Sequence, residues 1–188
     1  VNNGAAVVID NHTRRVVALV GTADFTAVSG QINAALTPRS PGSVLKPFTY
    51  LLAIDKLNYS PATILADVPT QYAGTRGPEA FINYDRKHRG PVSIHSALGN
   101  SFNVPAVRTL NALGGPRALH SLLQQLGINS LSEKPRHYGL GLTLGSGAVC
   151  LIDVTNGFAS IAVRNLQPVQ QLRYTVHTVA TVQRINKR

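Results

Sequence analysis

The sequence predicts an α+β fold, a type that broad classifications include in the α/β class. Two runs rich in β-branched residues open the chain, at residues 5–10 and 14–20. Several segments with apolar residues at helical spacing follow, and proline or glycine marks their ends. Because strands and helices do not alternate along the chain, the pattern does not indicate a series of βαβ units. The 188 residues, 44% of them hydrophobic, are sufficient to form a buried core.

The first twenty residues are predicted to form an antiparallel hairpin. Its two strands are the runs at residues 5–10 and 14–20, and residues 11–13 supply the turn. Residues 21–42 are rich in glycine, serine, threonine and proline and show no sustained periodicity. We interpret them as a surface connection that leads to a helix.

A helix is predicted over residues 43–57. Apolar side chains recur there at helical spacing, at Leu45, Phe48 and Leu52. Pro47 is compatible with a helix only in the first turn, where backbone N–H groups have no helical acceptor. Ser43 is therefore expected at the helix N-terminus.

The next segment, residues 58–92, contains scattered proline and glycine residues and two short candidate strands. We interpret it as loops beside the functional site. Helical spacing returns at Ser93, which is a suitable N-cap, and breaks again at residues 99–101. Pro105 then lies in the first turn of a further helix, which the glycines at residues 114–115 are expected to end.

Two more helices are predicted in the C-terminal half. The first spans residues 116–127, with proline at its start and glycine at its end, and the second follows a glycine-rich stretch and spans residues 151–163. We interpret the whole chain as one partial domain. Its parts are a hairpin at residues 1–20, a mainly helical region with the catalytic motifs at residues 43–165, and an unassigned segment at residues 166–188.

The charge balance is strongly basic, with 18 lysine and arginine residues against 8 acidic ones and a net charge of +10. These cations are scattered, with local groups only at residues 86–89 and 184–188, so solvated surface charge is a better interpretation than nucleic-acid binding. The single cysteine, Cys150, excludes an internal disulfide and any multi-cysteine zinc site. No stretch reaches the roughly 18 apolar residues of a membrane span, and we expect a soluble piece of a longer protein.

Ser43 and Lys46 are the first candidates for catalysis. They lie three residues apart, so a helix would project both side chains from one face. A serine hydroxyl becomes a strong nucleophile when a neighbouring base removes its proton, and lysine serves as that base when its amine is neutral. The start of a helix also supplies free N–H groups for an oxyanion. The spacing alone has a simpler interpretation, a helix cap followed by a surface lysine.

A second candidate pair is Ser101 and Asn103, which lie in the break before the helix that contains Pro105. The Ser101 hydroxyl can relay a proton. The Asn103 amide offers both a donor and an acceptor to a substrate amide. The alternative interpretation of this pair is a turn and a helix cap.

Other catalytic motifs are absent from the sequence. Residues 99–103 begin like a hydrolase nucleophile elbow but lack its final glycine, and residues 139–147 do not fit the dinucleotide-binding pattern. No Gly-Lys dipeptide occurs, which excludes a P-loop, and the six histidines show no His-Glu-x-x-His arrangement. We predict no metal site and no cofactor.

Taken in context, the two candidate pairs carry a family resemblance. Residues 40–50 resemble the nucleophile motif of class A penicillin-binding proteins, particularly of the 1C type. Residues 96–107 resemble the family's second motif, with the asparagine of its Ser-x-Asn form at Asn103. Three further segments follow the family's order, at residues 67–69, 90–92 and 139–145. The resemblance covers roughly residues 5–164.

This resemblance implies a DD-peptidase/β-lactamase-like transpeptidase fold with a helical lobe and part of an antiparallel sheet. It also implies a D,D-transpeptidase of peptidoglycan synthesis, with Ser43, Lys46, Ser101 and Asn103 in its site. Ser43 would form an acyl-enzyme with D-Ala-D-Ala stem peptides, and β-lactam antibiotics would acylate the same serine. The family acts outside the cytoplasm, at the periplasmic face of the inner membrane. Membrane attachment would come only through an N-terminal anchor that this chain lacks.

The family's third motif, a Lys-Thr-Gly strand, does not occur in the 188 residues. In the family this strand binds the substrate carboxylate and contributes to the oxyanion site, so the chain alone is expected to be an incomplete enzyme. We favour truncation of a longer domain as the explanation. The alternative is a non-catalytic module of the same fold that binds cell-wall peptide or acts as a sensor. The parent gene beyond Arg188 distinguishes the two.

Overall fold

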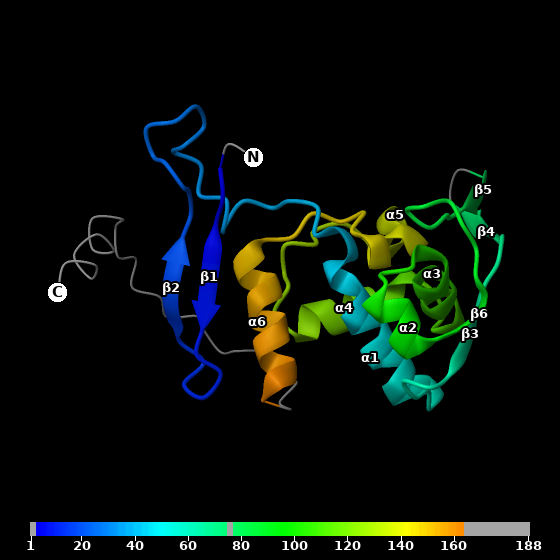
Figure 1. Ribbon diagram of the computed structural model, residues 1–188. Coiled ribbons are helices and arrows are strands. Elements are labelled where there is room, and N and C mark those ends of the chain that lie inside the picture. Colours follow the sequence, from blue (N-terminus) through cyan, green and yellow to red (C-terminus); the bar gives the residue numbers. More distant parts are fainter. Residues whose placement is uncertain (1–2, 75–76, 164–188) are drawn as a thin grey trace. The chain divides into compact units, whose positions relative to one another are not determined.

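The computed structural model describes residues 3–74 and 77–163, which fall into two compact units (Figure 1). The described part of the first unit comprises residues 3–39, 125–130 and 149–163. The second unit comprises residues 40–124 and 131–148. The segment that the sequence left unassigned, residues 166–188, lies outside the described residues.

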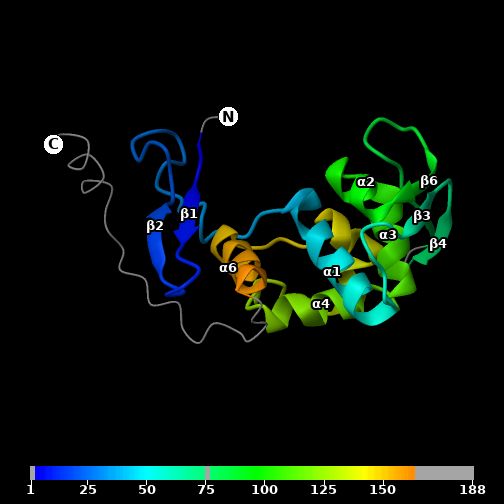
Figure 2. The same cartoon turned by 60° about the horizontal axis from the view of Figure 1, so that its bottom comes forward.

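The first unit contains a two-stranded antiparallel hairpin and one helix. Strands β1 (Ala6–Ile9) and β2 (Val16–Val20) pair with Ala6 opposite Val20, which confirms the predicted hairpin. Helix α6 (Leu151–Ala162) lies beside β1 in both views (Figures 1 and 2). The guanidinium of Arg14, in the hairpin turn, donates hydrogen bonds to two side-chain oxygens of α6. They are Asn156 Oδ1 at 3.1 Å and Ser160 Oγ at 2.8 Å. These bonds fix the hairpin against the helix.

The second unit is mainly helical, as the sequence predicted. Its helices are η1 (Gly42–Leu45), α1 (Lys46–Leu57), α2 (Ile94–Gly99), α3 (Asn103–Ala112), α4 (Pro116–Gln125), α5 (Pro135–Tyr138) and η2 (Leu140–Leu144). The hydroxyl of Ser93 accepts a hydrogen bond from the backbone of Ser96, so the predicted N-cap of α2 is confirmed. Glycines 114 and 115 both have positive φ angles, which end α3 as predicted.

The start of the first helix differs from the prediction. The sequence placed Ser43 at the N-terminus of an α-helix, but residues 42–45 form a 3₁₀ turn and the α-helix begins at Lys46. The backbone N–H of Lys46 donates to the carbonyl of Ser43, which is a 3₁₀ hydrogen bond. Pro47 explains the change, because it has no N–H to bond the Ser43 carbonyl and its ring would clash with that carbonyl in an α-helix.

The described part of residues 58–93 contains four strands, where the sequence indicated two short ones in residues 58–92. Strands β3 (Ile64–Asp67) and β6 (Gly90–Ser93) pair antiparallel, and so do β4 (Gln71–Gly74) and β5 (Gly77–Ala80). Each strand is only four residues long, and β5 and β6 each contain a proline, which weakens their sequence signal.

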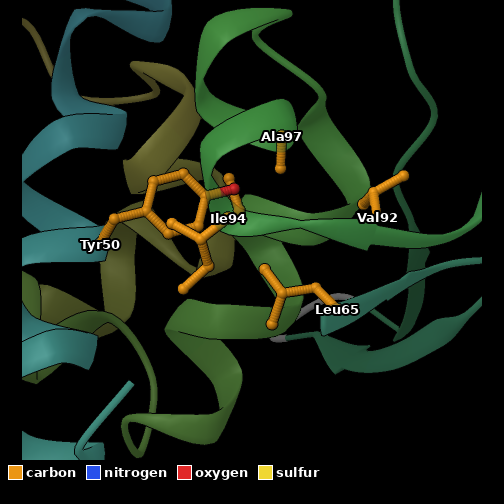
Figure 3. Packing of buried hydrophobic residues seen from close by; sticks show 6 residues of the cluster. Tyr50, Leu65, Val92, Ile94 and Ala97 are labelled. Carbon is orange, nitrogen blue, oxygen red and sulfur yellow. The ribbon is translucent and has the colours of Figure 1, made fainter. Parts of the chain in front are cut away.

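One apolar cluster joins the helices of the second unit to the β3–β6 pair. Its members are Tyr50, Leu65, Val92, Ile94, Ala97 and Ala106, all buried (Figure 3). They come from α1, β3, β6, α2 and α3, so the same cluster fixes α1 against the turn between α2 and α3. No helix among residues 3–74 and 77–163 is long and apolar enough to cross a membrane.

Leu110, a residue of α3 with no exposed surface, allows a test of the core. Leu110→Ala should lower the free energy of unfolding by about 2–5 kcal/mol, because it removes buried methyl groups and leaves a cavity. Leu98→Ala, at a position 36% exposed on α2, is the matched control and should cost clearly less. Chemical denaturation of both variants measures the difference, and equal losses would contradict this description of the core.

Candidate active site

Ser43 lies on the 3₁₀ turn that precedes α1, and its side chain is exposed. Gly42, immediately before it, has a φ angle of +56°, a backbone conformation that favours glycine. The chain therefore turns sharply and presents the Ser43 hydroxyl to solvent, three residues before Lys46. An exposed hydroxyl on a fixed turn is accessible to a substrate carbonyl.

Lys46, the first residue of α1, has a completely buried side chain. Its Nζ donates three hydrogen bonds, to the Ser101 carbonyl at 2.5 Å, to Ser101 Oγ at 3.1 Å and to Asn103 Oδ1 at 2.7 Å. Within the described residues, no carboxylate forms an ion pair with Lys46. Burial without a compensating negative charge lowers the pKa of Lys46 from 10.5 to about 8. Roughly a tenth of this amine is therefore neutral at pH 7, far more than for a solvated lysine.

The two acceptor residues belong to the turn between α2 and α3. Ser101 has a φ angle of +56°, which is unfavourable for serine, and its backbone N–H is bonded to the Leu98 carbonyl. Phe102 is held in the same way by the Ala97 carbonyl. This turn places both the carbonyl and the hydroxyl of Ser101 on the Lys46 amine.

Asn103 is the first residue of α3, and both ends of its side-chain amide are bonded. Oδ1 accepts from Lys46, and Nδ2 donates to the Ile82 carbonyl at 2.9 Å. The backbone N–H of Asn103 donates to Asn83 Oδ1 at 2.8 Å. Residues 82–83 therefore orient Asn103, whose side chain accepts the hydrogen bond from Lys46.

The turn before Ser43 packs against a second glycine. Gly145, which follows η2, has a φ angle of +90°, and a Cβ at this position would overlap the backbone of Gly42, with its Cα only 2.6 Å away. The Ser40 hydroxyl donates to the Gly145 carbonyl at 2.8 Å. This close approach of two backbones fixes the turn that carries the nucleophile candidate.

Another contact links η2 to α1. The hydroxyls of Thr49 and Thr143 are 2.7 Å apart and buried, so they form a hydrogen bond between the two elements. The glycine-rich stretch that the sequence analysis noted at residues 139–147 therefore supports the helix that carries Lys46.

The structure brings three of the four predicted site residues into direct contact, namely Lys46, Ser101 and Asn103. Ser43 lies on the turn that leads directly into Lys46 and makes no side-chain hydrogen bond among the described residues. Sequence reasoning missed Asn83, because no local pattern marks a loop residue whose contacts with Asp67, Asn103 and Val104 span 16 to 21 positions.

Comparison with known proteins gives the family. The family model described as "Penicillin binding protein transpeptidase domain" matches residues 4–148. The chain belongs to this family. Penicillin-binding protein 1C of Escherichia coli is 35% identical over 160 residues, which cover 84% of this chain and 20% of the relative. Penicillin-binding protein 1A of Streptococcus pneumoniae is 40% identical over 129 residues, which cover 66% of this chain and 18% of the relative. The chain thus spans about a fifth of the length of these relatives.

Solved structures confirm the α+β transpeptidase fold. The PonA1 protein of Mycobacterium tuberculosis, solved in complex with penicillin V, matches with a TM-score of 0.72 and 26% identity. The match covers 89% of this chain and 46% of that one. Penicillin-binding protein 1A of Haemophilus influenzae matches with a TM-score of 0.71 and 23% identity, over 84% of this chain and 23% of that one. The fold expected from the sequence resemblance is therefore correct.

The contact between Gly145 and Gly42 makes a second prediction. Gly145→Ala should destabilise the protein by about 1–3 kcal/mol more than Gly114→Ala. Both glycines have nearly the same φ angle, +90° and +86°, but a Cβ at Gly114 would meet open space. The pair therefore separates backbone strain from the clash with Gly42. Thermal or chemical unfolding measures the difference, and equal stabilities would mean that the close approach is unimportant.

Proposed function

We propose that this transpeptidase domain acts in peptidoglycan synthesis as a serine D,D-transpeptidase, with Ser43 as its nucleophile. The observation that carries the proposal is the buried Lys46 amine, whose lowered pKa gives it a neutral fraction one turn after an exposed serine. A lysine in this state can accept the serine proton, whereas a solvated lysine cannot do so efficiently. The family supports the reaction class, and the penicillin V complex of PonA1 supports β-lactams as a second class of ligand.

In the proposed first step, Ser43 Oγ attacks the carbonyl carbon of the penultimate D-alanine of a stem peptide. The Oγ proton passes to the Lys46 amine as the Oγ–C bond forms, and the carbonyl electron pair moves to the oxygen. Backbone N–H groups at the start of the helical segment stabilise the oxyanion. When the intermediate collapses, the C–N bond breaks and the leaving D-alanine takes a proton from the Lys46–Ser101 pair.

In the second step an acceptor amine attacks the acyl-enzyme and regenerates the Ser43 hydroxyl. Ser101 Oγ, bonded to Lys46 Nζ, relays the proton between the lysine and the amine. Asn103 holds Lys46 in place through Oδ1. A β-lactam follows only the first step, because its C–N bond lies in a ring and the leaving amine stays attached to the acyl group on Ser43, where it hinders the acceptor amine. We place the reaction outside the cytoplasm, at the periplasmic face of the inner membrane, where the stem peptides lie.

The identity of the nucleophile can be tested with fluorescent penicillin and the intact protein. Ser43→Ala should abolish covalent labelling, because no oxygen remains to form the ester. Ser132→Ala, at another exposed serine, should label like the wild type. Peptide mapping of the labelled wild type should identify the peptide that contains Ser43. Undiminished labelling of Ser43→Ala would refute the proposal.

The lowered pKa of Lys46 predicts the pH dependence of acylation. The neutral amine is the active form, so the acylation rate should rise with pH and level off above a midpoint of about 8. Lys46→Arg should slow acylation by at least about 100-fold at every pH, because a guanidinium stays protonated. Stopped-flow acylation from pH 6 to 10 measures both effects. A rate that still rises steeply at pH 10 would show that Lys46 titrates like a solvated lysine.

A further inference from the structure

A buried carboxylate lies behind the proposed site, at the end of strand β3. Asp67 has no exposed surface, and hydrogen-bond donors face both of its oxygens. Asn83 Nδ2 lies 2.9 Å from Oδ1 and 2.8 Å from Oδ2, and the backbone N–H of Arg89 donates to Oδ2 at 3.2 Å. Among the described residues, Asp67 makes no hydrogen bond or ion pair with Lys46, Ser101 or Asn103, so the proposed chemistry leaves it without a role.

The contacts of Asn83 fix the direction of its amide. Nδ2 faces the Asp67 carboxylate and the Lys87 carbonyl, which are both acceptors. Oδ1 faces the backbone N–H groups of Asn103 at 2.8 Å and Val104 at 3.2 Å, which are both donors. A flipped amide would set oxygen against carboxylate and NH₂ against N–H, which is unfavourable on both sides. The carboxylate therefore orients the amide.

Asn83 takes the place of a helix cap. The residue in the N-cap position of α3 is Phe102, which has no side-chain acceptor for the free N–H groups of the first turn. Asn83 Oδ1 accepts from two of those groups. The neighbouring carbonyl of Ile82 accepts from Asn103 Nδ2. The first residue of α3 is thus held at its backbone and at its side chain by the same dipeptide.

We propose that Asn83, oriented by Asp67, is a positioning residue that holds Asn103 and the α2–α3 turn against the Lys46 amine. Its effect on rate rests on the proposed function, whereas its effect on the geometry around Lys46 does not. Among the described residues, Asn83 makes no hydrogen bond to Lys46 or Ser43. It acts through Asn103, the residue that bonds Asn83 through its backbone and Lys46 through its side chain.

The position of Asn103 affects the protonation of Lys46. Burial is the cause of its lowered pKa, and Ser101 and Asn103, which are themselves partly or fully exposed, separate it from solvent. If Asn103 loses its anchor, water enters and the Lys46 pKa rises toward its ordinary value of 10.5. Less neutral amine is then present at neutral pH. A residue with a purely structural role elsewhere would not change this titration.

The charged and titratable groups around the network lie at Asp67 and not at the lysine. His88 Nδ1 is 3.4 Å from Asp67 Oδ1. The hydrogen bond with Asp85 is the main cause that raises the pKa of the Arg89 guanidinium, and the Asp67 charge adds to it. Burial first, and the Asp67 charge second, raise the pKa of Tyr50. In the part of the chain that the structure describes, the hydrogen-bond partners of the Lys46 amine are neutral groups of Ser101 and Asn103.

The first test compares Asn83→Ala with Asn111→Ala in the intact protein. Asn111 is exposed on the same helix, so it is a matched control. A titration of ¹³C-labelled lysine by NMR, with the Lys46 signal assigned by its loss in Lys46→Arg, should give a midpoint near 8 in wild type and control. Asn83→Ala should move the midpoint upward by at least about 1 pH unit. An unchanged midpoint would overturn the positioning role.

Acylation by penicillin supplies the second measurement on the same variants. Asn83→Ala should lower the first-order acylation constant at pH 7 at least about tenfold and leave the binding constant of the non-covalent complex nearly unchanged. The rate–pH profile should shift upward together with the Lys46 titration. If the wild type is not acylated at Ser43, the proposed function fails, but the lysine titration still decides the positioning role.

Asn83→Asp provides a second test of the positioning role, which applies even if Asn83→Ala does not fold. Its carboxyl group still accepts from the N–H groups of Asn103 and Val104, but it faces Asp67 and can donate to it only while the pair shares a proton. Mutual repulsion raises the pKa of this pair, so the cap should be present at low pH and lost as pH rises through that value. Relative to the wild type at the same pH, the backbone amides of residues 103–104 in Asn83→Asp should be protected from hydrogen exchange at pH 5 and should lose that protection at pH 8. Equal protection at both values would contradict the proposal.

Discussion

The structure around the site depends on one constraint, the burial of the Lys46 amine among neutral acceptors. A buried amine without a carboxylate is costly, because the charged form loses hydration and gains no opposite charge. Three oxygens from Ser101 and Asn103 satisfy its three hydrogens and offset part of that cost. The part of the desolvation cost that these bonds do not offset lowers the pKa of Lys46, and a catalytic base requires a lowered pKa. The same desolvation that disfavours folding therefore prepares the chemistry.

Keeping this arrangement rigid requires support from several directions. The apolar cluster around Tyr50 and Ile94 packs α1 against the elements that carry Ser101 and Asn103. The Thr49–Thr143 hydrogen bond and the contact of Gly145 with Gly42 hold α1 and the turn before it from another element, η2 and the glycine that follows it. All of these elements belong to one compact unit, residues 40–124 and 131–148. Packing within this one unit, between segments that lie 55 or more residues apart in the sequence, thus determines where the lysine lies.

Much of this could be predicted from the sequence, because the signals are local. The caps and breaks at Ser93, Pro105 and Gly114 gave the helices, and the spacing of Ser43 and Lys46 gave the candidate pair. Two kinds of feature could not be predicted. The 3₁₀ start before Lys46 is a small adjustment forced by Pro47. The cap that Asn83 provides depends on tertiary contacts across 20 residues, which no periodicity reveals.

The separation of Asp67 from Lys46 follows from the same electrostatic requirement. A carboxylate in contact with the lysine would favour the ammonium form and raise its pKa, which would remove the neutral base at physiological pH. The neutral side-chain amide of Asn83 links Asp67 to the backbone N–H of Asn103, and the side chain of Asn103 in turn accepts from Lys46. These connections fix the position of Asn103, because the Asn83 amide has a fixed donor end and acceptor end, but they carry no net charge to the lysine. The buried carboxylate of Asp67 can therefore hold the site in place without favouring the protonated form of Lys46.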